Sequence, residues 1–415
     1  MPLLLLMAWL GISEPMVPPD ESIRGALMQP ITVTEAVVRL ADGVERKVQV
    51  TRQTQFLVGT RGHLPIDPSQ IPSGTRVEIT IHGGIASRVR MEYSWFEYPG
   101  QWVDEIILDI SEWSKATWGP DAFFSLQNMT KALLAVLIVG LICGIVSSLV
   151  VSNRMAFFSD ALAHCAFAGF ALGLILYLLG AFVSLDGVLA VMVVFGAIIG
   201  LAIAYVREQT TLANDTIIGV FFAGAMGLGA ILLGALSRIG SRINPENFLF
   251  GDPFSVTGQQ LVYLTALLFI TVFFLVFRYN AMVLASFNPS LARSRRVRVR
   301  VGNYLFILLL ALVVNVCLNV VGALLINALL ILPAATAGNL ARNLRAFFWL
   351  TVGGSLLFGL GGFLTSVWWQ PSIGGRTIPM VSGGVIVLFG VGLFFASILL
   401  GRWVRGPRPA VRTAA

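Results

Sequence analysis

The chain has 415 residues, of which 56% are hydrophobic and 12% charged, and its mean hydropathy is +0.83. A soluble globular protein carries about a quarter charged residues, so this composition excludes a purely soluble enzyme and a disordered protein. The net charge of +7 is unevenly divided, with −5 over residues 1–130 and +12 over residues 131–415. The positive charge lies in short loops between apolar runs, so membrane topology explains it better than a nucleic-acid partner, and none is expected.

Residues 1–30 form the first predicted part, an apolar and flexible N-terminal segment. Its opening MPLLLLMAWLGI is too short to cross about 30 Å of hydrocarbon. It also lacks the basic start and the small-residue cleavage site of a secretory signal. A truncated signal, an interfacial anchor and the remnant of a longer span therefore all remain open.

Residues 31–95 predict a small β-rich domain outside the membrane. Stretches such as ERKVQVTRQTQFLV and TRVEITIH alternate or cluster β-branched residues between Gly, Pro and Asp turn signals. We expect a small antiparallel β-domain or half-barrel. His63 and His82 lie beside turns, and no other ligand repeats near them at metal-site spacing, which favours exposed loop histidines over a metal site.

Residues 96–130 form an amphipathic, tryptophan-rich linker. Trp102, Trp113 and Trp118 are interleaved with acidic residues. Because tryptophan prefers the headgroup level of a bilayer, we expect this segment to lie along the membrane surface. A buried linker is the alternative.

Residues 131–402 predict a polytopic α-helical membrane domain of about nine helices, followed by a basic cytoplasmic tail at 403–415. The apolar runs cover approximately 132–151, 161–183, 187–206, 216–236, 260–277, 303–322, 324–338, 346–367 and 379–400. The seventh run is short, so the count could change by one or two. Three cysteines lie inside these runs, and no disulfide framework is expected.

The arginines predict the orientation. If the first span runs inward, 14 of the 18 basic residues after position 130 fall in cytoplasmic connections. The positive-inside rule then places the N-terminal domain outside and the C-terminus in the cytoplasm of a bacterial-type plasma (inner) membrane.

Polar residues inside the apolar runs are the candidate functional residues, because each is costly in lipid. Asp160 and His164 stand four apart, so on a helix they share a face and offer a carboxylate and an imidazole to a passing divalent metal ion. Alternatively, Ser159 and Asp160 cap the helix and His164 bonds to a neighbour. Asn315, Asn319 and Asn327 are interpreted as interhelical hydrogen-bonding residues or as pore-lining groups.

Several of these segments together resemble the permeases of metal-ion ABC transporters, of the zinc, manganese and iron type. The resemblance rests on RMAFFSDALAHCAFAGFALG, with Ser159 in place of the family's usual glycine, on NDTIIGVFFAGAMGLGAILL, FLFGDPFSVT, ASFNPSLARSRRVRV and VGALLINALLILPAATAGNLAR, and on the Pro-Ser-x-Gly-Gly turn at 371–375. It covers residues 125–402, in order. The N-terminal domain has no counterpart in ordinary family members.

The resemblance implies a metal- or vitamin-type ABC importer permease fold. It implies a homodimer beside two ATPase subunits, fed by an external metal-binding protein. The chain would be a transporter subunit in the lipid bilayer, not an enzyme, and would need no cofactor. Zinc is favoured as cargo because FFSDALAHCAFAG lacks the proline that often follows the histidine in manganese permeases; manganese and iron remain open.

The segment after Pro333, AATAGNLARNLR, resembles the cytoplasmic coupling helix that docks into the ATPase. We expect the proline to interrupt the helix and the charge to face the cytoplasm. The predicted coupling residues are Pro333, Ala334, Asn339, Arg342 and Arg345. An ordinary basic loop is the alternative interpretation.

The sequence also bears on the source of energy. None of its three lysines lies in a G-x-x-x-x-G-K-[ST] loop, so the chain cannot bind ATP in the P-loop manner. Either a partner subunit hydrolyses ATP, or the chain is an ATP-independent secondary metal-ion transporter.

Overall fold

The computed structural model divides the chain into two compact units, residues 1–113 and 114–415. It describes residues 21–28, 35–40, 44–51, 54–58, 64–65, 76–82, 85–91, 99–119, 123–180, 186–238, 251, 253–295, 298–369, 372–373, 376–377 and 381–405. His63, the opening apolar residues 1–12 and most of the 403–415 tail lie outside these ranges.

The described residues of the first unit form seven strands. They are β1 (Glu21–Leu27), β2 (Glu35–Leu40), β3 (Glu45–Gln49), β4 (Gln55–Val58), β5 (Leu64–Pro65), β6 (Arg76–His82) and β7 (Ile85–Met91). Their order in the sheet is β3-β2-β1-β6-β7-β4-β5. The β-rich domain therefore begins at Glu21, ten residues earlier than predicted, because β1 lies between β2 and β6 and is an inner strand of the sheet.

The sheet closes on itself. Gln49 at the end of β3 pairs with Ile85 of β7, and β4 continues along the same edge of β7, from Gln55 opposite Arg88 onward. Both pairings are parallel, whereas the other pairings of this sheet are antiparallel. With β3 and β4 taken as one interrupted strand, the connectivity is that of a five-stranded Greek-key barrel of the OB type, a more specific fold than the predicted half-barrel.

The barrel core consists of aliphatic side chains in alternating positions. Val77, Ile79 and Ile81 of β6 are buried, while Glu78 and Thr80 between them are partly exposed. The same period of two brings in residues from the other long strands, among them Ile23, Leu27, Val38, Val48 and Val89. The alternation visible in the sequence thus becomes the inside and the outside of the barrel.

The predicted linker contains a helix, α2 (Pro99–Trp118). Trp102, Trp113 and Trp118 are 48%, 58% and 60% exposed. Ile106 and Ile110 are also exposed and stand one helical turn apart, between Trp102 and Trp113. Together with these two tryptophans they form one apolar stripe along the helix. The location of this stripe at a membrane surface stays a prediction.

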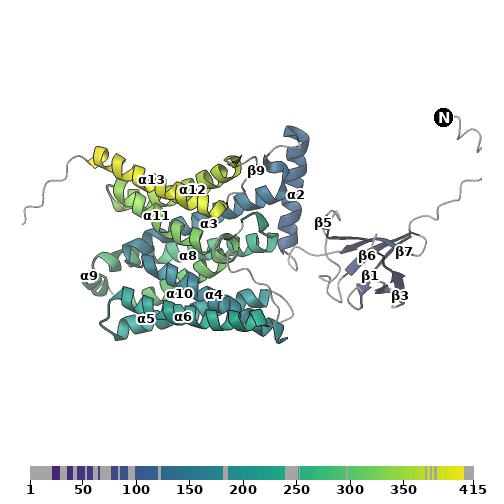
Figure 1. Ribbon diagram of the computed structural model, residues 1–415, viewed down its shortest axis with the longest axis horizontal. Coiled ribbons are helices and arrows are strands. Elements are labelled where there is room, and N and C mark those ends of the chain that lie inside the picture. The colour runs from purple at the N-terminus through teal and green to yellow at the C-terminus, as the bar shows by residue number, and fades with distance from the viewer. Residues whose placement is uncertain are drawn as a thin grey trace, which may run out of the picture. The chain divides into compact units, whose positions relative to one another are not determined.

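The second unit is a helical membrane domain (Figure 1). Among the described residues, nine helices are long and apolar enough to cross a membrane, and the predicted membrane fold is confirmed. They are α3 (Gln127–Ser152), α4 (Ala156–Leu178), α5 (Asp186–Gln209), α6 (Asn214–Arg238), α8 (Gly258–Phe287), α10 (Val299–Val321), α11 (Ala323–Leu340), α12 (Leu344–Trp368) and α13 (Ser382–Arg405). The first begins four residues before the predicted boundary.

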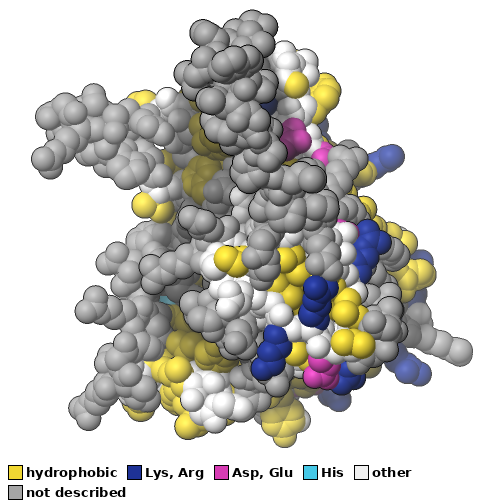
Figure 2. Space-filling view, turned by 90° about the vertical axis from the view of Figure 1, so that its right-hand side faces the viewer, with side chains coloured by type: hydrophobic (Ala, Val, Ile, Leu, Met, Phe, Trp, Pro, Cys, Tyr) yellow, Lys and Arg dark blue, Asp and Glu magenta, His cyan; other side chains and the backbone are white. Residues whose placement is uncertain are grey.

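These helices pack in two groups that meet at α10 and α11. Helix α4 packs against α5 and α6, whereas α11 and α12 pack against each other and each packs against both α3 and α13. Close approach depends on small residues: a Cβ on Gly362 would lie 2.4 Å from the Ile386 Cα. Large apolar side chains such as Phe273 and Val276 remain about 70% exposed, as a lipid-facing surface requires. Figure 2 shows a different face of the molecule, the right-hand side of Figure 1, on which both basic and acidic side chains lie among hydrophobic ones.

The expected interruption at Pro333 is wrong, because α11 runs through the proline to Leu340. A proline removes one backbone donor and disturbs the turn before it, which neighbouring side chains in a membrane protein can repair. Here the Ser147 hydroxyl on α3 donates to the Leu330 carbonyl at 2.7 Å, three residues before the proline. A side chain of α3 thus satisfies a carbonyl in the turn before the proline, within a helix that remains continuous.

Candidate functional site in the membrane helices

Helix α4 carries the candidate pair in its second and third turns. The helix begins at Ala156, and the capping position is Met155, whose side chain makes no capping hydrogen bond. The Ser159 hydroxyl donates to the Ala156 carbonyl at 2.9 Å. The alternative that Ser159 and Asp160 cap the helix is therefore wrong, and Asp160 is available for another role.

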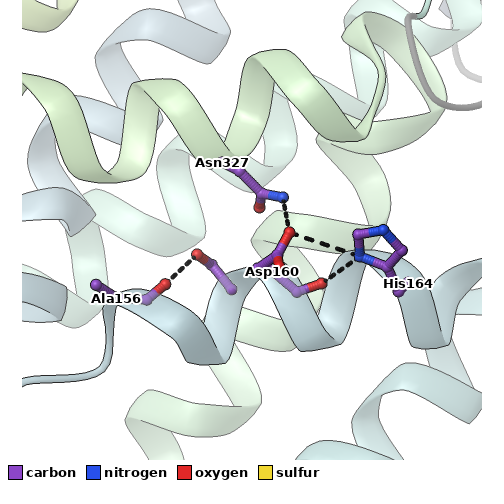
Figure 3. A network of polar contacts seen from close by, with 5 residues as sticks. Ala156, Asp160, His164 and Asn327 are labelled. Carbon is purple, nitrogen blue, oxygen red and sulfur yellow. Dashed lines mark hydrogen bonds and ion pairs between the residues drawn. The ribbon is translucent and has the colours of Figure 1, made fainter. Parts of the chain in front are cut away.

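Asp160 and His164 lie together on one face of α4 (Figure 3). His164 Nδ1 is 3.5 Å from Asp160 Oδ1 and 2.9 Å from the Asp160 backbone oxygen. The His164 ring also packs edge-on against Phe222 of α6, with ring centroids 4.9 Å apart. The imidazole is thus held in place from two helices, while the Asp160 side chain is 44% exposed.

Asn327 of α11 joins this pair. Its Nδ2 donates to Asp160 Oδ1 at 2.6 Å, so it is an interhelical hydrogen-bonding residue as well as part of the site. Its own Oδ1 is buried without a hydrogen-bond partner. Asn315 instead bonds within its own helix, to the Ala311 carbonyl, and Asn319 is exposed. Of the three asparagines, Asn327 alone contacts the candidate pair by a hydrogen bond in the described structure.

A cavity of about 340 Å³ opens between α4 and α6 beside the pair. Asp160 lines it from α4, and Asp215 lines it from the first turn of α6. Apolar residues complete the wall, namely Phe157, Ala161, Ile218, Gly219 and Phe222. Asp215 is not among the candidate residues predicted from the sequence. An acid in a chain with so few membrane acids was the available signal.

The polar groups around this cavity fit transient contact with a cation better than a permanent metal site. No group of three or more His, Cys, Asp or Glu side chains able to hold a metal ion exists among the described residues. A carboxylate and an imidazole can replace part of an ion's hydration shell without retaining it. Such weak ligation suits a pathway along which an ion must also leave.

The predicted coupling residues do not form one exposed surface. Pro333 and Ala334 are buried inside α11, and Asn339 Nδ2 donates to the Ser397 hydroxyl of α13 at 3.0 Å. Arg342 and Arg345 are exposed at the connection to α12, which begins at Leu344 with Asn343 as its cap. The buried members can therefore set the position of this connection, and the two arginines can contact a partner.

The full set of membrane segments matches a known family. A family model described as the ABC 3 transport family matches residues 125–401. The chain belongs to this family. The match begins after α2, so the barrel and α2 lie outside it.

This ABC 3 family member is similar to several known membrane proteins over nearly their whole length. The manganese transport system membrane protein MntC of Halalkalibacterium halodurans is 30% identical over 298 residues, which are 71% of this chain and 97% of the relative. The high-affinity zinc uptake system membrane protein ZnuB of Haemophilus influenzae is 28% identical over 248 residues, 60% of this chain and 91% of the relative. The structure is similar to a chain of PsaBC from Streptococcus pneumoniae in complex with Fab, with a TM-score of 0.56 and 22% identity over 72% of this chain and 97% of that chain.

Proposed function

We propose that this permease imports a divalent transition-metal ion, powered by a separate ATPase subunit. The observation that carries the proposal is the Asp160–His164 pair, which is held by Asn327 and lies beside a cavity between membrane helices. Relatives named for manganese and zinc transport support the class of cargo. The lack of a P-loop supports a partner as the ATPase.

Zinc is the proposed preferred cargo. An imidazole suits zinc better than manganese, which favours carboxylates and water. In a competition with equal free concentrations of the two ions, zinc should enter first. Uptake of manganese in preference to zinc would contradict this part of the proposal while leaving the metal-importer function intact.

Uptake in reconstituted vesicles tests the function itself. The full chain, purified with its ATPase subunit and its external metal-binding protein, should accumulate zinc only when ATP is supplied on the ATPase side. A variant ATPase that binds but does not hydrolyse ATP should abolish this uptake. Uptake that continues with the inactive ATPase would overturn the proposal and support the ATP-independent secondary transporter.

Two substitutions test the ion path. Asp160→Asn keeps the shape and an oxygen that can accept from Asn327, but removes the charge; His164→Ala removes the nitrogen ligand. Each should lower transport by about tenfold or more, with expression and ATP hydrolysis retained. Ser159→Ala is the matched control, because its hydroxyl bonds only within the first turn of α4. Full transport in both variants would remove the pair from the mechanism.

The connection between α11 and α12 is the proposed docking surface for the ATPase. Arg345→Glu reverses an exposed charge there and should abolish co-purification of the ATPase, with membrane insertion unchanged. Lys47→Glu, an exposed charge in the barrel, is the control and should leave the complex intact. If the Arg345 variant co-purifies at full yield, the docking surface lies elsewhere.

The assembled importer is proposed to be a homodimer in a bacterial-type plasma membrane, with the barrel outside and the C-terminus in the cytoplasm. The distribution of basic residues supports this orientation. Protease added to intact cells should remove the barrel and spare the C-terminus. Protection of the barrel from the protease would show that the topology is the reverse of the proposed one.

A further inference from the structure

A shallow crevice lies where four membrane helices end or begin. The turn between α3 and α4 borders it on one side, and the end of α5 and the start of α6 border it on the other. Its polar residues are Arg154, Arg207 and Asn214; its apolar residues are Met155, Phe158, Ile203, Ile217 and Ile218. Helix ends of spanning segments lie at the headgroup level of a bilayer, so the crevice does too.

Arg154 occupies a backbone position that favours glycine. Its φ is +57°, the one positive value among the described residues other than glycine. The Met155 amide donates to the Val150 carbonyl and the Arg154 amide to the Val151 carbonyl, which is the pattern of a Schellman helix end. Glycine is the usual residue at this position because it has no Cβ. An arginine here accepts backbone strain, which points to a role for its side chain.

Among the described residues, the two arginines at the crevice form no close ion pair, although the Glu208 carboxylate interacts electrostatically with Arg207. No ion pair to either guanidinium within 4.0 Å is found in the described part of the chain, where Arg154 is exposed and Arg207 half-buried. The nearest acid in sequence is Glu208, whose carboxylate accepts a hydrogen bond from the Tyr304 hydroxyl at 3.2 Å. Two positive charges that face one crevice repel each other unless an anion lies between them.

The first backbone N–H groups of α4 and α6 add to this preference for an anion. Met155 and Asn214, which line the crevice, stand at the starts of these two helices. Unpaired N–H groups at a helix start attract negative charge. The crevice therefore combines two guanidinium groups, two helix starts and an apolar lining, and the two guanidinium groups offset the negative ends of α3 and α5 that also border it.

We propose that this crevice binds the phosphate group of an anionic phospholipid. The apolar lining favours a lipid over a free anion, because α4 and α6 also carry exposed apolar side chains. Phe157 is 65% exposed and Val220 66%. A phosphate between Arg154 and Arg207 thus leaves the acyl chains along a surface that faces hydrocarbon. Arg154 and Arg207 are among the arginines expected at the cytoplasmic side, where anionic lipids attract basic residues.

Lipid retention by the full chain tests this assignment without any transport measurement. The delipidated protein in detergent is offered equal amounts of phosphatidylglycerol and phosphatidylcholine, and bound lipid is counted by native mass spectrometry. Wild type should retain phosphatidylglycerol. Arg154→Gly, which suits the backbone at that position, and Arg207→Gln should each weaken this retention by about fivefold. Arg298→Gln, an exposed arginine at the start of α10, is the control and should match wild type.

Three results would overturn the proposal. Equal phosphatidylglycerol retention by a double variant, Arg154→Gly with Arg207→Gln, and by the Arg298→Gln control would show that the crevice binds no lipid. If millimolar inorganic phosphate displaces phosphatidylglycerol from wild type as effectively as excess phosphatidylglycerol does, the site recognises a free anion. If the double variant loses the ATPase subunit in phosphatidylcholine nanodiscs but keeps its lipid preference, the crevice is a protein docking site. Failure of metal uptake alone bears on none of these readouts.

Discussion

The β-barrel and the membrane helices place their polar side chains on different sides. In the barrel, charged residues lie outside, as in the Arg24–Glu78 pair at 2.9 Å, and the core is aliphatic. In the membrane unit, buried positions include Ser147, Ser355 and Asn315, whereas the exposed positions of α8 carry phenylalanine and valine. The difference follows from the solvent: lipid accepts apolar side chains and leaves polar groups to bond inside.

This contrast implies that the two units respond differently to a cavity in the core. Ile79 is fully buried in the barrel, so Ile79→Ala should lower its free energy of unfolding by about 2–5 kcal/mol. Hydrogen exchange of the full chain should show faster exchange at the β6 amides, with the membrane helices still protected. Ser22→Ala, at an exposed position of β1, is the control. Loss of protection in both units would mean that they do not unfold separately.

In the membrane helices, adding a side-chain atom at a close helix contact should lower stability more than removing one does. A Cβ on Gly362 would lie 2.4 Å from the Ile386 Cα, so Gly362→Ala should lower the free energy of unfolding by about 1–3 kcal/mol. Gly353 is on the same helix and has no atom within 4 Å of such a Cβ. Gly353→Ala should therefore be neutral or stabilising, since alanine favours a helix.

Thermal unfolding in detergent measures this pair of variants. A lower midpoint for Gly362→Ala alone would show that close helix contact sets the stability of the membrane unit. Equal midpoints would mean that α12 and α13 can move apart at little cost.

The sequence predicted the membrane spans well and the contacts between them poorly. Each span is visible in the sequence as an apolar run, because a membrane helix forms its backbone hydrogen bonds within one segment. The bond between Asp160 and Asn327 joins residues 167 positions apart, so no local pattern reveals it. Pro333 was misjudged for the same reason: the Ser147 hydroxyl that supports the proline turn comes from α3.

The barrel shows a similar balance. Its alternating strands were predicted from residue 31 onward, but β1 was assigned to a flexible segment because ESIRGAL has a weak alternation beside an apolar N-terminus. The closure of β3 on β7 was also missed, since parallel pairing leaves no turn signal in the sequence. Long-range pairing, not strand propensity, is what the sequence alone does not show.

A buried hydroxyl is expected to contribute modestly to the membrane unit. The Ser355 hydroxyl on α12 donates to the Gly140 carbonyl of α3 at 2.7 Å. Ser355→Ala should lower the free energy of unfolding by about 0.6 kcal/mol, and by no more than about 1.7 kcal/mol. Thr365→Ala is the control, because its hydroxyl bonds within α12. An effect as large as that of Gly362→Ala would show that interhelical hydrogen bonds, not packing, dominate here.

The exposed ion pairs of the barrel should contribute least. Arg39 on β2 and Glu45 on β3 are directly paired across the two strands. Arg39 Nη2 lies 2.9 Å from Glu45 Oε1, and both side chains are about half exposed. Water screens such a pair, and ordering two long side chains opposes it, so the Arg39→Ala, Glu45→Ala double-mutant cycle should give about 0.2–1 kcal/mol. That value should fall as salt is added, because the screening length shortens to about 3 Å at 1 M. A larger coupling that salt does not reduce would mean that the pair is shielded from water in the full protein, and the barrel surface would then resemble the membrane interior in its polar contacts.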